Sequence, residues 1–105
     1  MLTYPEKLID EEVMAEFDFT DRIKAIDPDL TLTSCVSDIT VQSGVDPSPN
    51  TMKNGGIAQA GMVVAQPIKA GLEFVNYAIK FTATLSNGMK VSEQGLIRVV
   101  KFRKD

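Results

Sequence analysis

The strongest constraint on the fold is a long alternation of apolar and polar residues in the second half of the chain. Every second position from 75 to 85 is apolar, namely Val75, Tyr77, Ile79, Phe81, Ala83 and Leu85. A period of two is typical of a strand that buries one face. Asn87-Gly88 follows and favours a type I′ hairpin turn, in which both central residues need positive φ. The sequence therefore predicts a hairpin whose second strand runs from about Met89 to Phe102, with a bulge at Gly95.

The rest of the chain is typical of short strands separated by turns. Residues 13–19 alternate, with Phe17 and Phe19 on one side. Residues 30–41 form an extended run rich in Thr, Val and Ile, and its irregularity at 35–37 fits either a bulge or two short strands. Residues 62–66 predict a strand that ends at Pro67, and residues 69–71 predict a turn.

These segments favour an all-β fold, a β-sandwich of about seven short antiparallel strands. The 105 residues fit one domain. Residues 13–105 are assigned to the sandwich. The alternation predicts a core of Phe17, Phe19, Leu32, Val63, Tyr77, Ile79, Phe81, Ile97 and Val99.

Two further segments stand apart from the predicted strands. Residues 1–12 are interpreted as an N-terminal arm, within which residues 5–12 have room for one helical turn. Residues 42–56 are rich in Pro, Gly and Asn, so they predict a long loop. Because its composition offers little apolar surface to hold it down, we expect this loop to be mobile and, if it is a docking element, to become ordered on binding.

The charges are divided unevenly along the chain. Residues 1–52 hold eleven acidic and three basic residues, a net charge of −8, whereas residues 53–105 hold three acidic and eight basic residues, a net charge of +5. Acidic and basic strands can pair within one domain, or a dipolar surface can orient neighbouring copies. Intrachain pairing is favoured, with Glu16 and Asp18 beside Arg98, Lys101 and Arg103, and with the first dozen residues free to reach a partner.

The composition argues against catalysis and against cofactors. The chain has no histidine and one cysteine, Cys35, which is interpreted as a small buried residue. The carboxylate pairs Glu11/Glu12, Asp18/Asp21 and Asp27/Asp29 lie in strands or turns, and a calcium site of Asp27, Asp29 and Asp46 lacks the usual ligand spacing. No catalytic residue, cofactor-binding residue or metal ligand is therefore predicted.

The sequence also gives little support for nucleic-acid or membrane binding. Arg98, Lys101, Arg103 and Lys104 form the single basic cluster, with Phe102 as its one aromatic residue, which is weak support for a nucleic-acid site. The longest apolar runs, such as residues 61–65, are far shorter than the roughly 20 residues needed to span a bilayer. We therefore expect neither partner.

Residues 74–100 resemble the last hairpin of an immunoglobulin-like sandwich. Tyr77 stands where such domains place a tyrosine whose hydroxyl bonds nearby backbone, and Ile79 replaces a cysteine. Taken with Glu16-Phe17-Asp18-Phe19-Thr20, the run 30–41 and the apolar strand before the turn at 69–71, the chain is similar to small phage structural proteins with one immunoglobulin-like domain. It departs from them by having no tryptophan and a longer 42–56 loop.

This resemblance implies a non-enzymatic virion protein, a capsid or tail accessory or decoration component assembled in the host cytoplasm. Its partners would be other virion proteins or copies of itself, a homo-oligomer included. The alternative is a ligand- or carbohydrate-binding sandwich module. Sugar binding normally uses exposed aromatic side chains, whereas Tyr77 and Phe81 fall on the predicted core face, so the structural class is favoured.

Overall fold

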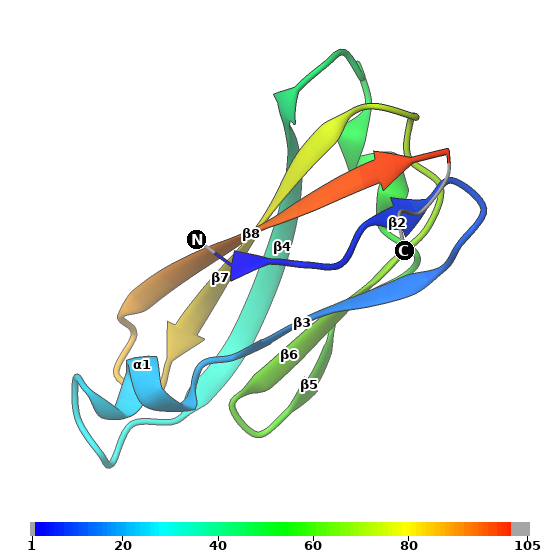
Figure 1. The fold of residues 1–105 in the computed structure, drawn as a ribbon. Helices are drawn as coiled ribbons and strands as arrows, with labels where there is room; N and C mark the ends of the chain where they lie inside the picture. Colours follow the sequence, from blue (N-terminus) through cyan, green and yellow to red (C-terminus); the bar gives the residue numbers. More distant parts are fainter. Residues whose placement is uncertain (1, 102–105) are drawn as a thin grey trace.

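The computed structural model describes residues 2–101 and shows a mostly β chain with two sheets (Figure 1). Within these residues lie eight strands, one short α-helix and one 3-10 helix. The elements are β1 (Leu2–Thr3), β2 (Lys7–Leu8), β3 (Val13–Asp18), α1 (Thr20–Lys24), β4 (Leu32–Ser43), η1 (Pro49–Met52), β5 (Ala58–Ala60), β6 (Val63–Ile68), β7 (Asn76–Leu85) and β8 (Lys90–Val100). The predicted all-β fold is confirmed.

The two sheets differ in size and in strand direction. The larger has the order β1-β8-β7-β4, with β2 also paired to β8, and the smaller has the order β3-β6-β5. The pairs β4–β7, β7–β8, β3–β6 and β5–β6 are antiparallel, but β1 and β2 both run parallel to β8. The expectation of antiparallel strands alone is therefore wrong at the N-terminal edge.

The predicted hairpin of β7 and β8 is present, but its details differ from the prediction. Gly88 has a φ of 88°, whereas Asn87 is not among the residues with positive φ, so the turn is not type I′. The Leu85 amide donates to Met89 O and the Gly88 amide to Leu85 O, so three residues form the loop. Gly95 pairs regularly with Ile79 and is not a bulge. A Cβ at Gly95 would lie 2.3 Å from Cε2 of Tyr4, so the glycine makes room for that ring.

Two other strand predictions, the irregularity at residues 35–37 and the strand end at Pro67, are wrong. Residues 35–37 pair regularly, and the register shifts lie instead between Leu32 and Ser34 and between Val41 and Ser43, so β4 is one long strand. Pro67 does not end β6. The Asn54 amide donates to Pro67 O on the side away from β3, and β5 covers only residues 63–65 of β6. The missing N–H of Pro67 therefore interrupts no ladder.

The core lies between the two sheets and agrees largely with the predicted one. Of the nine predicted residues, Phe19, Leu32, Tyr77, Ile79, Phe81, Ile97 and Val99 are buried. Phe17 and Val63 are only partly buried. Val64, the neighbour of Val63, is fully buried instead, so the inward face of β6 is one residue out of phase with the prediction.

The N-terminal arm is docked on the domain, so the expectation of a free segment is wrong. Leu2 and Thr3 pair with Gly95 and Leu96, and Lys7 and Leu8 pair with Val99 and Val100. The segment 5–12 contains β2 and a turn rather than a helical turn. The arm thus takes the place beside the last strand that the sequence assigned to residues 16–18.

The predicted pairing of Glu16 and Asp18 with the basic last strand is wrong as well. Glu16 pairs with Ala65 and Asp18 with Val63, both on β6. Arg98 lies 3.9 Å from the carboxylate of Glu6 on the arm, in an exposed ion pair of the kind that contributes about 0–1 kcal/mol. Arg103 lies outside the described residues.

The segment 42–56 is tied to both sheets, contrary to the expectation that little holds it down. Met52 in η1 is fully buried. Asn50 accepts the backbone N–H of Ile39 through Oδ1, and Gln66 donates to Gly55 O through Nε2. The sequence suggested mobility because this segment has no continuous apolar surface. In the structure, one buried apolar side chain and hydrogen bonds between side chains and backbone hold it in place.

Candidate functional site

The most unusual backbone in the chain lies in the turn 69–75, which joins β6 to β7. Ala70 has a φ of 52° and Phe74 a φ of 65°, and within residues 2–101 no other non-glycine residue has positive φ. Such a conformation costs roughly 1–2 kcal/mol per residue, because Cβ approaches the carbonyl oxygen. Residues in strained backbone conformations persist only where the surrounding structure holds them, and they cluster at functional sites.

The buried ammonium of Lys7 holds the first part of this turn. It donates to Ala70 O at 2.6 Å and to Leu8 O at 2.7 Å, with Ile9 O farther away at 3.4 Å. Lys7 has no exposed surface. Burial lowers the pKa of its ammonium from the ordinary value, while Glu11 and Asp10 act in the opposite direction. Lys7 therefore couples the N-terminal arm to the strained turn.

The hydroxyl of Tyr77 holds the middle of the turn. It accepts the backbone N–H of Leu72 at 2.8 Å and donates to Oδ2 of Asp46 at 2.7 Å. This bond to backbone five residues upstream is the contact that the sequence predicted for Tyr77. Burial, and secondly the hydrogen bond and charge of Asp46, raise the pKa of Tyr77 to about 12, against the lowering effect of the Leu72 amide. One phenol oxygen thus joins the turn to residues 44–48.

Close packing and one backbone bond complete the support of the turn. The Phe74 amide donates to Val99 O at 2.9 Å. Gly71 has a φ of 94°, and a Cβ there would lie 2.9 Å from Cγ2 of Val99 and 3.0 Å from Cε of Met52. A side chain at this position would therefore require Val99 or Met52 to move, and glycine also accommodates the positive φ.

The turn presents apolar side chains to solvent. Phe74 is 72% exposed and Leu72 is 48% exposed, and Val45, on the adjoining segment, is 82% exposed. Large apolar side chains that are exposed together mark contact surfaces on many proteins. We call the turn 69–75 with residues 44–48 the Phe74 end. It lies where β7 begins and β8 ends, opposite α1 (Figure 1).

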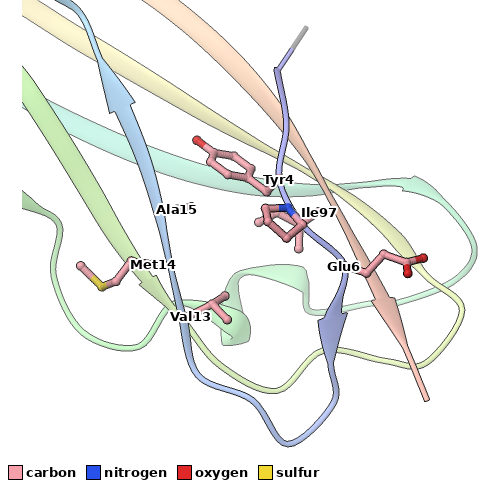
Figure 2. A pocket seen from close by; sticks show the side chains of 7 residues that line it. Tyr4, Glu6, Val13, Met14, Ala15 and Ile97 are labelled. Carbon is pink, nitrogen blue, oxygen red and sulfur yellow. The ribbon is translucent and has the colours of Figure 1, made fainter. Parts of the chain in front are cut away.

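A second feature is an apolar cavity of about 140 Å³ between the arm, β3 and β8 (Figure 2). Tyr4 and Ile97 form one side of it, and Val13 and Met14 form the other. The complete lining is Tyr4, Pro5, Glu6, Val13, Met14, Ala15 and Ile97. The Tyr4 hydroxyl donates to Glu16 O at 2.7 Å, which ties the arm to β3 beside the cavity. Burial, and secondly the charge of Glu16, raise the pKa of Tyr4 to about 12.

The structure does not bring the carboxylates that the sequence singled out into one site. Asp27 accepts the Asp29 amide in a turn near α1, whereas Asp46 lies at the Phe74 end. Asp18 accepts the amide and the hydroxyl of Thr20, and these bonds lower its pKa. Within residues 2–101, no group of three or more side chains that bind metals comes together.

The remaining candidate groups from the sequence are Cys35 and the basic cluster at residues 98–104. Cys35 is buried, and burial raises the pKa of its thiol to about 11, which is far from a reactive thiolate at neutral pH. Of the basic cluster, Arg98 lies beside Glu6, while Phe102, Arg103 and Lys104 lie outside the described residues. No helix among the residues that the structure describes has the length and apolar character to cross a membrane.

Phe74 was not among the residues that the sequence singled out. Its position contained a usable signal, since Phe74 is out of phase with the alternation that begins at Val75. An aromatic residue in that phase cannot join the core face of β7. The strain at its backbone had no such signal, because nothing in residues 69–75 indicates that Phe74 adopts positive φ.

Comparisons with known proteins identify no relative of this chain. No family model matches it, and neither the curated proteins nor the solved structures include a match.

Proposed function

We propose that this chain is a non-enzymatic structural protein of a phage virion, built on an immunoglobulin-like sandwich, that acts through protein–protein contacts at its Phe74 end. The observation that carries the contact surface is Phe74 itself, an aromatic side chain held 72% exposed on a backbone of positive φ. A fold that maintains strain to expose an apolar ring supports a binding role for that ring.

The order of the strands supports the immunoglobulin-like part of the proposal. Constant-type immunoglobulin domains pair their second, fifth and fourth strands in one sheet and their third, sixth and seventh strands in the other. With the arm counted as the first strand, β3-β6-β5 and β4-β7-β8 have these orders, whereas the arm departs from the constant type because it pairs with β8 and not with β3. The bond from Leu72 N–H to the Tyr77 hydroxyl is a further point in favour.

The virion setting is supported by the resemblance of the sequence to small phage structural proteins. Purified phage particles from a host that expresses this chain would test it by mass spectrometry and immunogold labelling. We expect the chain in the particles at many copies, and we expect Phe74→Asn to remove it from them while its soluble level is unchanged. Absence of the unaltered chain from the particles would overturn the proposal.

The carbohydrate-binding alternative gains one observation from the structure. Phe74 is an exposed aromatic ring, the type of side chain on which sugars stack. Its neighbours Leu72 and Val45 are apolar and exposed, whereas a sugar site also needs polar groups that converge on the ligand. A glycan array probed with the wild type and with Phe74→Asn separates the two functions, since glycan binding that Phe74→Asn abolishes would favour the alternative.

A further inference from the structure

We propose that Asn54-Gly55 is a site of spontaneous deamidation in the folded protein, and that the acidic product repels Glu12 and weakens the contact between residues 42–56 and the N-terminal arm. Two observations carry this inference. Asn54 is followed by glycine, and its Nδ2 donates to Oε1 of Glu12 at 2.8 Å. The site is separate from the Phe74 end and does not depend on what that surface binds.

The reaction uses the backbone nitrogen that follows the asparagine. Glycine favours it, because glycine has no Cβ to hinder the approach of this nitrogen to the side chain. The Gly55 nitrogen gives its proton to water and forms a bond to Cγ of Asn54. The bond from Cγ to Nδ2 breaks, and Nδ2 takes up a proton and leaves as ammonia. One water molecule then opens the succinimide ring at either carbonyl carbon, which gives aspartate or isoaspartate.

The chain contains a second dipeptide of this kind, Asn87-Gly88, in the hairpin between β7 and β8. Its attacking nitrogen is already engaged, since the Gly88 amide donates to Leu85 O at 2.9 Å. Its side-chain carbonyl is engaged as well, since Oδ1 of Asn87 accepts the Met89 N–H at 3.0 Å. The reaction would have to break the first bond and displace the second, so the structure protects Asn87.

The attacking nitrogen of Gly55 has no such restraint. Within residues 2–101 its N–H has no hydrogen-bond acceptor in the protein, and Gly55 is exposed. A Cβ there would meet nothing within 4 Å, so the space around the reacting atoms is open. The nearest backbone bonds run from Asn54 N–H to Pro67 O and from Gln66 Nε2 to Gly55 O. Neither bond uses the attacking nitrogen, so neither has to break.

The product reverses the character of the contact with Glu12. A carboxylate at position 54 has no N–H to donate, and it places a second negative charge beside the first. The adjacent Lys53 directs its ammonium to Ser37 O at 2.8 Å. Isoaspartate also adds one carbon to the backbone between residues 54 and 55. Each modified chain therefore loses a bond between residues 42–56 and the last residue of the arm, and modified chains accumulate with time.

Peptide mapping of the whole folded chain, during incubation at mildly alkaline pH, tests the site. Trypsin cleaves after lysine and arginine, so it releases residues 54–69 and 81–90 as separate peptides, each with one Asn-Gly and no other asparagine. We expect aspartate and isoaspartate to accumulate several times faster at Asn54 than at Asn87. The control is the chain unfolded in guanidinium chloride, where the two sites should react at similar rates because the dipeptide is the same.

Variants that carry the aspartate product from the start test its consequence. Asn54→Asp should lower the midpoint of thermal unfolding, by a small amount because Glu12 is exposed and water screens the repulsion. Adding Glu12→Gln should recover most of this loss, since the glutamine amide can donate to the new carboxylate; Glu12→Gln alone completes the cycle. Asn87→Asp is the matched control, because its carboxylate can still accept the Met89 N–H, and its midpoint should not change.

The two parts of the inference fail separately. Equal rates at Asn54 and Asn87 in the folded chain, or a faster reaction at Asn87, overturn the modification site. If Asn54→Asp unfolds at the same temperature as the wild type, or if Glu12→Gln does not reduce its loss, the repulsion of Glu12 is overturned. The presence of the chain in purified particles is a different measurement, so the proposed function stands or fails independently of these results.

Discussion

The turns at the two ends of the molecule differ in their backbone conformation and in the exposure of their aromatic residues. At the end that carries α1, Phe19 and Ile23 are fully buried, and the nearby turns obtain positive φ from Gly61 and Gly88. At the Phe74 end, Gly44 and Gly71 have positive φ as well, but Ala70 and Phe74 adopt it without being glycine. The α1 end avoids strain and buries its aromatic residue, whereas the Phe74 end maintains strain and exposes one.

This difference separates residues that stabilise the fold from residues available for contact. A turn that served the fold alone would place glycine where φ is positive, as the α1 end does. The Phe74 end is held by the buried ammonium of Lys7 and by the hydroxyl of Tyr77, two polar groups buried in an otherwise apolar region. The fold thus stabilises a turn that is intrinsically unfavourable, and the exposed ring is the result.

The largest expected effect comes from truncating the buried aromatic residue of the α1 end. Phe19→Ala should lower the free energy of unfolding by about 3–5 kcal/mol, since it leaves a cavity at a fully buried position. Phe74→Asn should change it by less than about 1 kcal/mol, as exposed substitutions usually do. Urea denaturation of both variants measures the contrast, and equal losses would contradict it.

High pH should act on the Phe74 end through Tyr77. The pKa of Tyr77 is raised to about 12 in the folded chain, above the usual value near 10, so the unfolded chain loses this proton first. The free energy of unfolding is therefore unaffected below pH 10 and falls as the pH rises toward 12, by about 2–3 kcal/mol from this group. Tyr4 acts in the same direction.

Denaturation at several pH values checks this dependence, with Tyr77→Phe as the comparison. The variant should be less stable at neutral pH by about 1–3 kcal/mol, because Asp46 and the Leu72 amide lose their partner. It should also lose less stability between pH 10 and 12 than the wild type. An identical alkaline loss in the two proteins would show that Tyr77 is not the group responsible.

The docking of the arm should depend on the glycine beneath Tyr4. In Gly95→Ala the added Cβ would overlap the Tyr4 ring, so we expect a loss of about 1–3 kcal/mol and faster amide exchange at Tyr4. Gly56→Ala is the matched control, because a Cβ there meets nothing within 4 Å. If both substitutions have the same effect, the close approach of Tyr4 to Gly95 does not matter for stability.

The smallest effect has the opposite sign. Phe74→Gly relieves the positive φ but makes the unfolded chain more flexible, so we expect a net gain of about 0.5–1 kcal/mol. The same variant should lose the contacts of the Phe74 end. Thermal unfolding measures the gain, and a clear loss of stability would mean that the ring supports the fold rather than binding.

The sequence predicted those parts of the fold that local patterns encode. The alternation from Val75 to Leu85 placed β7 and its core face, and the resemblance of this hairpin to that of immunoglobulin-like domains predicted the bond between Tyr77 and nearby backbone. Where the pattern was weak, the phase was lost, as at Val63 and Val64. The short helix α1 had no pattern to reveal it, since five residues are too few for a helical period.

Tertiary structure alone decided which segments pair and which residues are strained. The sequence placed Glu16 and Asp18 beside the basic last strand, but the arm occupies that edge, because the Tyr4 ring packs over Gly95 and the Lys7 ammonium donates to Ala70 O on the turn 69–75. These partners lie far apart along the chain, and no local period records them. Alternation is a property of neighbouring residues and can be read from the sequence, whereas the cavity, the buried ammonium and the positive φ of Phe74 exist only after distant segments have come together.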